Sequence, residues 1–320
     1  MYLLATLLLT AIMLLYFKVA DRFNIIDHPS ERSSHTRITI RGGGIVFAVA
    51  ILMAFILGHA SWEITLAVLM VATVSFVDDI RPLSQLPRFT VHMLASLLVL
   101  YEVGLWQYSL WWIPLVLIVL LGWVNIFNFM DGINGITALY TLAVLVGFYL
   151  LPELSEYREL ILLVALSVAV FAFFNVRQKA KTFAGDVGSI SMAFILGYLM
   201  LNLILISGEV HYLLFFAVYG IDGVFTILQR LVRRENIFKP HRTHLYQYLA
   251  NEMNWGHLKV SFLYSGIQLL INVFVVSYIH SVKNPSLLFF IFIFFGMIVI
   301  YFYTKFVILK KIKTGRRCLN

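Results

Sequence analysis

Residues 109–127 read SLWWIPLVLIVLLGWVNIF, a run that contains no Asp, Glu, Lys or Arg. A helix of about 20 apolar residues crosses about 30 Å of hydrocarbon, so this run is long enough to span a membrane. Similar apolar blocks recur along the chain, over residues 2–18, 43–60, 63–77, 89–104, 109–127, 134–151, 159–175, 188–206, 211–229, 259–279 and 286–307. The sequence therefore predicts an all-α integral membrane protein with about eleven transmembrane helices.

The composition favours the same class. Hydrophobic residues make up 61% of the chain and charged residues 12%, whereas a soluble domain needs about 25% charged residues. The first block lacks a basic start and a small-residue cleavage site, which favours a retained span over a signal peptide. No repeat or linker divides residues 1–320, so we expect a single polytopic domain. Cys318 is the only cysteine, which excludes a disulfide within these residues.

The basic residues predict the orientation. Of 24 Lys and Arg residues, only Arg158 and Lys283 fall in connections on one side of the predicted membrane. Under the positive-inside rule the opposite, basic side is cytoplasmic, with the N-terminus outside and the C-terminus inside. The basic residues behind the net charge of +8 are spread over the loops between spans, where they reflect membrane topology. We therefore expect the lipid bilayer as a partner and no nucleic acid.

The aspartates predict a site on that same side. All of them lie in the inner connections or the inner half of a span, while the outer connections use only Glu. Short carboxylates gathered on one face indicate a shared function. We therefore expect cytoplasmic active-site loops over residues 18–42, 78–88, 125–134, 176–188 and 230–258.

Asp78 and Asp79 end the third predicted span. Adjacent carboxylates at a membrane boundary repel each other and are costly to desolvate, so a divalent cation or a catalytic role would compensate them. A solvated helix end is an equally good interpretation of this pair alone.

Asn125, Asn128 and Asp131 recur every three residues and are followed by Gly-Ile-Asn-Gly. On a helix this spacing places them on one polar stripe, and amide and carboxylate oxygens suit a hard cation, a sugar or a phosphate. A helix-ending turn is the minor alternative.

Phe-Ala-Gly-Asp-Val-Gly-Ser, residues 183–189, opens the eighth predicted span. The glycines allow a ligand to approach the backbone, and the free N–H groups of a helix start favour phosphate. Lys179 and Lys181 add positive charge just upstream. Taken alone, this segment is equally consistent with an N-cap at Ser189.

His241, Arg242 and His244 lie in the longest basic loop. Two histidines without a third ligand are a weak zinc signal, so a phosphate or nucleotide contact is the better hypothesis. The loop of residues 27–44 is similarly polar and is consistent with a flexible connector. Asp222, within the ninth span, is as consistent with a structural partnership as with a functional role.

Together these segments resemble a known family, the polyprenyl-phosphate N-acetylhexosamine-1-phosphate transferases (glycosyltransferase family 4). The resemblance runs from about Asp27 to Gln247. It rests on Asp-His-Pro-Ser-Glu-Arg-Ser-Ser-His, Arg-Gly-Gly-Gly, the Asp pair, Asn-x-x-Asn-x-x-Asp-Gly-Ile-Asn-Gly, Ala-Lys-x-Phe-x-Gly-Asp-x-Gly-Ser and the His loop. These are bacterial inner-membrane enzymes, and the resemblance is to the branch that initiates O-antigen (lipopolysaccharide) and other cell-envelope glycans.

The His loop departs from the family pattern. Many members have His-x-His-His, whereas here His244 is followed by Leu245, Tyr246 and Gln247. This version looks like the branch that uses 6-deoxy sugars such as N-acetylfucosamine or N-acetylquinovosamine. We therefore favour a donor of that kind, with UDP-N-acetylglucosamine as the alternative.

The resemblance implies a reaction. Undecaprenyl phosphate attacks the β-phosphorus of a UDP-N-acetyl sugar, UMP leaves, and a polyprenyl-pyrophosphate-linked sugar is formed. Mg²⁺, or alternatively Mn²⁺, would neutralise the two phosphates. The lipid phosphate is already mostly ionised near pH 7, since its second pKa is about 6, so we expect direct in-line attack without a covalent aspartyl intermediate. The resemblance also allows a homodimer.

The expected residue roles are as follows. The catalytic residues are Asp78, Asp79, Asp131, His241 and His244. The substrate-binding residues are Arg242, Asn125, Lys181, Asn175, Gly185 and Ser189. The metal ligands are Asn128 and Asp186.

Two other classes share some of these features. A secondary transporter also has many spans and intramembrane carboxylates, but its site should lie near mid-membrane between inverted repeats. A scaffold of a glycan-assembly complex would have no need for the aligned Asn-x-x-Asn-x-x-Asp.

Overall fold

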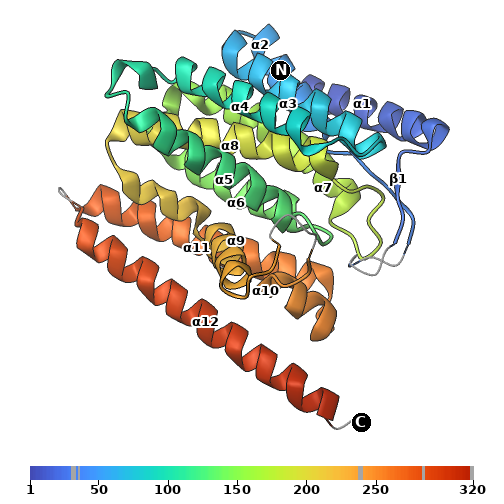
Figure 1. The fold of residues 1–320 in the computed structure, drawn as a ribbon. Helices are drawn as coiled ribbons and strands as arrows, with labels where there is room; N and C mark the ends of the chain where they lie inside the picture. The colour runs from blue at the N-terminus through green and yellow to red at the C-terminus, as the bar shows by residue number, and fades with distance from the viewer. Residues whose placement is uncertain (30–33, 35–36, 237–240, 283–284, 318–320) are drawn as a thin grey trace.

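The computed structural model describes residues 1–29, 34, 37–236, 241–282 and 285–317 (Figure 1). Its helices are α1 (Tyr2–Phe23), α2 (Ile45–Ile56), α3 (Trp62–Ile80), α4 (Gln85–Glu102), α5 (Trp112–Met130), α6 (Ile136–Leu150), α7 (Arg158–Asn175), α8 (Gly185–Ser207), α9 (Ala217–Val232), α10 (Leu245–Gln247), α11 (His257–Ser281) and α12 (Leu287–Arg317). Short 3₁₀ segments cover Leu105–Gln107, Pro152–Tyr157 and Val210–Phe216, and a π turn covers Tyr248–Glu252. The predicted all-α class is confirmed.

Each of the eleven predicted spans forms one helix, but they differ in length and apolarity. Seven described helical segments are long and apolar enough to cross a membrane: α1, α5, α7, α8, α9, α11 and α12, with α7 and α9 each extended by the 3₁₀ turn before it. Helices α2 and α6 are apolar but have only 12 and 15 residues. Helix α3 has 19 residues and includes Glu63, Asp78 and Asp79, which lower its apolarity.

One pair of strands was not predicted. β1 (Ile26–Asp27) pairs antiparallel with β2 (Thr39–Ile40), and Ile40 makes a further bridge to Thr182. Two-residue strands carry no alternation that a sequence pattern could reveal. The bridge attaches the polar loop after α1 to the segment before α8.

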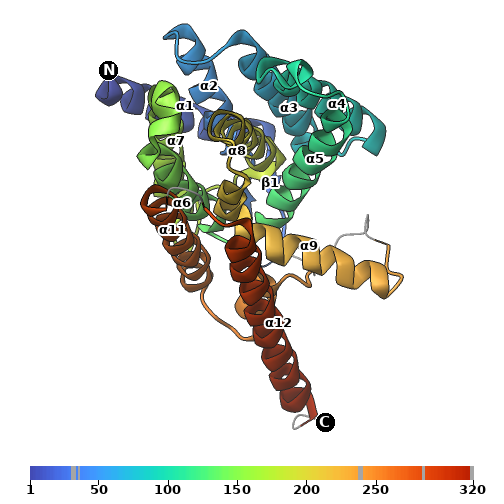
Figure 2. The same ribbon diagram turned by 90° about the vertical axis from the view of Figure 1, so that its left-hand side faces the viewer.

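Helix α8 forms the centre of the bundle. It packs against α2, α3, α5 and α6 and lies among the other helices in Figure 2. Of its most apolar 18-residue stretch, 78% is buried, compared with 11% for α12, which runs along the edge of the molecule. Such an all-round apolar helix is typical of a buried core element.

The start of α8 touches the start of α2 through glycine. A Cβ built on Gly188 would lie 2.6 Å from the Gly44 Cα, and one built on Gly44 would lie 2.3 Å from the Gly188 Cα. Gly44 N also donates a hydrogen bond to Ala184 O at 3.1 Å. This contact joins the Arg-Gly-Gly-Gly and Gly-Asp-x-Gly segments backbone to backbone.

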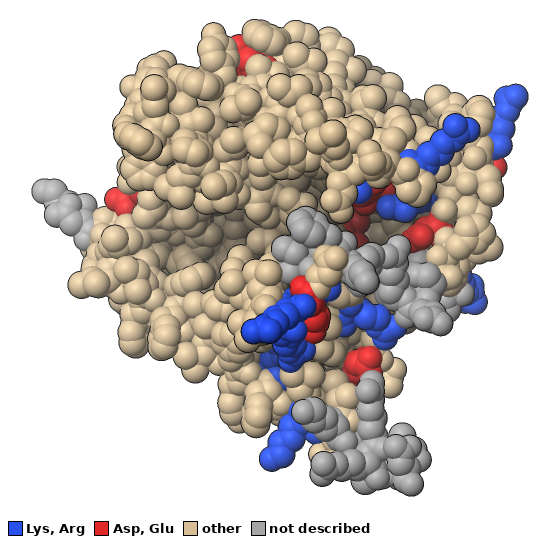
Figure 3. All heavy atoms as spheres, in the orientation of Figure 1, with Lys and Arg blue, Asp and Glu red and all other residues tan. Residues whose placement is uncertain are grey.

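The ends of α3 and α5 meet the start of α8 at one end of the bundle. Figure 3 shows Lys, Arg, Asp and Glu gathered over this end, while most of the remaining visible surface carries none of them. The predicted site segments therefore lie together in space, although they come from distant parts of the chain.

Gly188→Ala should destabilise the protein, because the new methyl group meets backbone that cannot rotate away. We expect a loss of about 1–3 kcal/mol, measured as a lower midpoint of thermal unfolding in detergent. The matched control is Gly220→Ala in α9, where a Cβ meets nothing within 4 Å. Equal midpoints for the two variants would contradict the close packing.

Candidate active site

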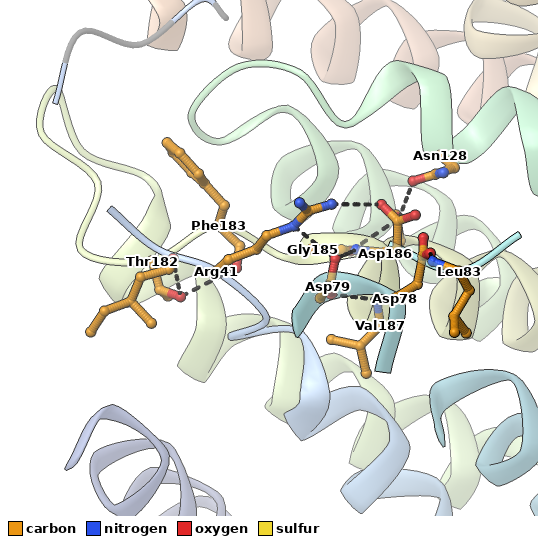
Figure 4. A network of polar contacts seen from close by, with 12 residues as sticks. Arg41, Asp78, Asp79, Leu83, Asn128, Thr182, Phe183, Gly185, Asp186 and Val187 are labelled. Carbon is orange, nitrogen blue, oxygen red and sulfur yellow. Dashed lines mark hydrogen bonds and ion pairs between the residues drawn. The ribbon is translucent and has the colours of Figure 1, made fainter. Parts of the chain in front are cut away.

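The strand pair positions Arg41 beside the start of α8. Phe183 N donates to Ile40 O at 2.8 Å, and Gly43 N donates to Phe183 O at 2.9 Å. These bonds hold the loop of residues 40–44 against residues 182–185. Figure 4 shows Arg41 with Thr182, Phe183 and the acids. Arg41, which directly follows β2, is thereby directed toward the predicted acids.

Asp79 lies at the centre of this arrangement. Its buried carboxylate accepts hydrogen bonds from Asp186 N at 3.0 Å and Val187 N at 3.1 Å, and Arg41 Nε lies 2.7 Å from its Oδ1 (Figure 4). An anion at a helix start is stabilised by the free N–H groups there. Gly185 has φ +71°, and a Cβ there would lie 2.4 Å from Asp79 Oδ2, so only glycine allows this approach.

Two arginines connect the three acids. Arg41 Nη2 lies 3.2 Å from Asp186 Oδ1, and Arg88 Nη2 lies 3.4 Å from Asp186 Oδ2. Arg88 Nη1 also lies 2.8 Å from Asp78 Oδ2. The other Asp78 oxygen accepts a hydrogen bond from Leu83 N at 2.6 Å. Each guanidinium thus bridges two carboxylates and offsets the repulsion between them.

The charge of Arg41 is secured by its neighbours. Burial alone would lower the pKa of its guanidinium, but Asp79 and Asp186 raise it above the usual value. About a third of the Arg41 side chain remains exposed. It is therefore a charged group that both binds the acids and reaches solvent.

Asn128 and Asp131 face the acids from the end of α5. Ser189 Oγ, from α8, donates to Asn128 Oδ1 at 2.6 Å, and Thr137 donates to the Asp131 carboxylate. Burial raises the pKa of Asp131 to about 6, against the opposing effect of the Thr137 hydrogen bond. The carboxyl is therefore still mostly ionised at pH 7.

Asn134 and Asn175 hold the backbone of the site. Asn175 Oδ1 accepts from Gly135 N at 2.8 Å, and its Nδ2 donates to Thr182 O at 2.8 Å. Asn134 Nδ2 donates to Arg177 O at 2.9 Å. Both amides connect the start of α6 to the loop between α7 and α8, so the sequence motif that contains Asn134 also has a structural role.

A cavity of about 420 Å³ opens beside these residues. Its size falls within the range of about 300–1,000 Å³ typical of small-molecule sites. It is lined by Asp27, His28, Ser34, Arg41, Asn128, Phe129, Asp131, Gly132, Ile133, Asn134, Asn175, Phe183, Gly185, Asp186, His241, Tyr246, Gln247 and His257. Most of this lining is polar, as a charged or sugar ligand requires.

The predicted site residues fall into three groups. Six line the cavity: Asn128, Asp131, Asn175, Gly185, Asp186 and His241. Four lie directly behind the lining: Asp78 and Asp79 contact Asp186 through the arginines, Ser189 contacts Asn128, and His244 contacts His241. The other three, Asn125, Lys181 and Arg242, lie outside it.

The three outer residues have other partners. Asn125 is exposed and donates to Leu121 O, 2.8 Å away on its own helix. Lys181 Nζ lies 4.5 Å from the centroid of the Phe17 ring. Arg242 Nη2 lies 3.5 Å from Glu252 Oε1. Within the predicted active-site loops 18–42 and 230–258, residues 30–33, 35, 36 and 237–240 lie outside the described part of the chain.

The histidines of the 241–244 loop form a stack. The rings of His241 and His244 are 4.9 Å apart, and His244 is buried with its Nδ1 3.7 Å from Asp222 Oδ1. Burial lowers the pKa of His241 to about 4, assisted by His244. His241 is therefore neutral at pH 7 and acts as a hydrogen-bonding group rather than as a cation.

Two residues of the site, Arg88 and His257, are not predicted from the sequence as site residues. Arg41 belongs to the Arg-Gly-Gly-Gly motif of the family resemblance, but no role at the site is predicted for it. Arg88 and His257 come from the starts of α4 and α11, and nothing in their local sequence indicates a site.

The donor set of the cavity fits a hard cation. Within the described ranges there is no group of three His, Cys, Asp or Glu residues arranged to hold a metal. Asp186, Asp131 and Asn128 nevertheless present carboxylate and amide oxygens to one cavity, and oxygen ligands are what Mg²⁺ prefers. Since Arg41 and Arg88 contact both Asp186 oxygens, a cation there would have to share or displace these ion pairs.

Asp79→Asn should lower stability, because an amide offers one acceptor oxygen where the carboxylate offers two. We expect a loss of about 1–3 kcal/mol, seen as a lower midpoint of thermal unfolding in detergent. Asp21→Asn, at an exposed position, is the control. A midpoint as high as that of the control would show that Asp79 does not support the start of α8.

Parts of the chain are similar to known proteins. Residues 61–204 match the model of a family described as glycosyl transferase family 4. The chain is 24% identical over 263 residues to a probable undecaprenyl-phosphate N-acetylglucosaminyl 1-phosphate transferase of Bacillus subtilis, covering 72% of this chain and 71% of that protein.

Phospho-N-acetylmuramoyl-pentapeptide-transferases are also similar. Identity is 30% over 160 residues with the protein of Lactococcus lactis and 28% over 174 residues with that of Thermotoga maritima. The matches cover 47% and 53% of each chain, so here the similarity spans about half the length of the relatives. The part of the chain that contains Asp78, Asp79, Asn128, Asp131 and Asp186 is thus the part that matches glycosyl transferase family 4.

Proposed function

We propose that this protein transfers an N-acetylhexosamine-1-phosphate from a UDP-sugar to undecaprenyl phosphate and releases UMP. The observation that carries the proposal is the cluster of Asp78, Asp79 and Asp186 with Arg41 and Arg88 beside a polar cavity. The names of the similar transferases support the choice of reaction. The lipid acceptor fits a protein whose described residues include seven apolar helices long enough to span a bilayer.

The position of the cluster favours a transferase over a secondary transporter. The acids lie at the ends of α3 and α5 and at the start of α8, at one end of the bundle. A transporter site is expected near the middle of the membrane, between broken helices. A site at the membrane boundary can bring a water-soluble nucleotide to a lipid phosphate. We place it on the cytoplasmic face of the bacterial inner membrane.

Charge neutralisation is the main chemical task. Both substrates carry negative phosphates, and their repulsion opposes the approach of the lipid phosphate to the β-phosphorus. Arg41 lines the cavity and is partly exposed, so its guanidinium can bind phosphate oxygens while Asp79 holds its Nε. Arg88 holds Asp78 and Asp186 in place. These groups position phosphates rather than exchange protons.

A divalent cation completes this assignment. Asp186 and Asn128 would hold Mg²⁺, with Asp131 as a supporting ligand, and the cation would neutralise charge on the nucleotide and on the leaving UMP. Ser189 orients the Asn128 oxygen through its hydrogen bond. The adjacent His241 is neutral at pH 7 and would donate a hydrogen bond to phosphate or sugar.

Direct attack by the lipid phosphate is favoured by the state of the two adjacent acids. The Asp79 carboxylate is buried and accepts from two backbone N–H groups and Arg41. Both Asp78 oxygens are also occupied, by Leu83 N and Arg88. Neither carboxylate presents a free oxygen as a nucleophile, and the lipid phosphate needs no base at pH 7.

The donor is proposed to be a 6-deoxy N-acetyl sugar nucleotide for O-antigen or related glycan synthesis. Tyr246 and Gln247, which replace two histidines of the family pattern, both line the cavity. Tyr246 OH donates to Phe129 O at 2.9 Å, which fixes the ring at the cavity wall. Tyr246 and Gln247 are therefore placed to contact the part of the donor that binds against this wall of the cavity.

Asp186→Asn should lower Mg²⁺-dependent release of UMP by about 100-fold, as expected for loss of a group that stabilises developing charge. The assay uses membranes carrying the protein, a UDP-sugar and undecaprenyl phosphate. EDTA should abolish release by the unchanged protein, and added Mg²⁺ should restore it. Asp21→Asn should behave like the unchanged protein. Equal release by the Asp186 and Asp21 variants would refute the assigned role.

A panel of UDP-sugars tests the donor. We expect kcat/KM for UDP-N-acetylfucosamine or UDP-N-acetylquinovosamine to exceed that for UDP-N-acetylglucosamine by about 10–100-fold, the discrimination available from one hydroxyl group. The measurement is formation of the lipid-linked sugar with undecaprenyl phosphate. A protein that uses only UDP-N-acetylglucosamine would contradict the 6-deoxy assignment and leave the transfer reaction intact.

A further inference from the structure

Asp222 of α9 is buried within the bundle and accepts hydrogen bonds from the chain around His244. Its carboxylate accepts from Leu245 N at 2.8 Å and from Tyr246 N at 3.3 Å. The Tyr264 hydroxyl of α11 donates to it at 2.8 Å. His244 Nδ1 lies 3.7 Å from its Oδ1. One carboxylate therefore fixes the start of α10 and faces one nitrogen of the His244 ring.

Helix α12 reaches the same carboxylate. The Tyr301 hydroxyl donates to Asp222 Oδ1 at 3.2 Å. Lys305 Nζ donates to the Tyr301 hydroxyl at 2.8 Å and to Thr226 Oγ1 at 3.0 Å. Thr226 Oγ1 itself donates to Asp222 Oδ1 at 3.3 Å. Lys305 and Tyr301 thus form the outer layer of a network centred on Asp222.

These contacts are unusual for this helix. Only 11% of the most apolar stretch of α12 is buried, yet Lys305 is 3% exposed and Tyr301 is 7% exposed. A lysine within an apolar helix is costly to bury unless it is paired. Two of the few buried side chains of α12 are therefore polar, and both are directed toward Asp222.

His244 links this network to the cavity. Its ring is 1% exposed and lies between His241 and Tyr246, with ring centroids 4.9 and 5.8 Å away, and both of these neighbours line the cavity. Neither Nδ1 nor Nε2 of this ring has a hydrogen-bond partner within the described ranges, and Nδ1 is the nitrogen that faces Asp222, 3.7 Å from its Oδ1. The negative charge of the Asp222 carboxylate favours the tautomer of His244 that carries its proton on Nδ1, which leaves Nε2 to accept a hydrogen bond from a ligand.

We propose that Lys305 and Tyr301 of α12 are positioning residues that act on the site through Asp222 and His244. The proposal rests on the proposed function, because it names residues that prepare that site. They touch neither the cavity nor its ligand. They hold the Asp222 carboxylate, which sets the tautomer and orientation of His244 and the path of the chain through Tyr246.

Lys305→Met tests the proposal in a double-mutant cycle with His244→Asn. We expect kcat/KM for UMP release to fall about ten-fold when His244 is present and to change less than about two-fold in the His244→Asn background. Lys310→Met, at an exposed position on the same helix, is the control and should have no effect. An equal loss in both backgrounds would mean a general structural effect and would overturn the proposal.

Tyr301→Phe is a second variant that removes a single oxygen. Its control is Tyr303→Phe, which removes the same atom from a side chain that is 69% exposed. Tyr301→Phe should lower kcat/KM while the midpoint of thermal unfolding stays within a few degrees of that of Tyr303→Phe. Activity equal to that of the control would contradict the positioning role.

A spectroscopic measurement separates this proposal from the proposed function. ¹⁵N-histidine NMR spectra of the detergent-purified protein, with the His244 signals assigned from His244→Asn, should shift in Lys305→Met and Tyr301→Phe but not in Lys310→Met. Unchanged His244 signals in both variants would refute the positioning role. If these signals shift while the unchanged protein releases no UMP from any UDP-sugar, the proposed function fails and the positioning role stands.

Discussion

The carboxylate of Asp79 at the start of α8 is the interaction on which the site depends. It accepts from two backbone N–H groups of the central helix and from Arg41, so it connects α3, α8 and the loop before α2. Asp186 is itself one of the two residues whose backbone N–H groups bind Asp79. Arg41 and Arg88 then connect the Asp186 side chain to Asp79 and Asp78. The helix start and the two arginines together compensate the charge of the three buried acids, whereas an unpaired buried charge would be costly.

The sequence was sufficient for the helical class and for the segments that form the site. Apolar blocks of about 20 residues predict helices because the bilayer requires internally bonded backbone. The inner aspartates and the Asn-x-x-Asn-x-x-Asp spacing led to Asn128, Asp131 and Asp186, which line one cavity. The helical class is confirmed because membrane insertion and helical periodicity are local properties of the chain, while the roles of these residues stay predictions.

What the sequence did not reveal depends on tertiary contacts. Arg41 enters the site because Ile40 bonds to the chain at Thr182 and Phe183, across 142 residues. Arg88 enters the site because the first turn of α4 brings it to Asp78 and Asp186, and His257 enters because α11 begins at the cavity. Asn125 shares its predicted stripe with Asn128 but lies on the exposed side, since α5 presents its last turn rather than its whole length to the cavity. Asp78 and Asp79 were expected to repel each other unless a divalent cation or a catalytic role compensated them, or to be a solvated helix end, whereas here arginines offset the repulsion.

The contact between Gly44 and Gly188 has a consequence for sequence divergence. The two α-carbons are so close that one added methyl group would clash with the other glycine. Neither glycine can therefore be replaced by a larger residue while its partner keeps its position. Their segments also carry Arg41 and Asp186. A larger residue at either glycine would therefore move Arg41 away from Asp186 as well as disrupt the packing of the two segments. Among relatives of this chain, the two positions should evolve as one unit, with any larger residue accompanied by a shift of the loop that faces it.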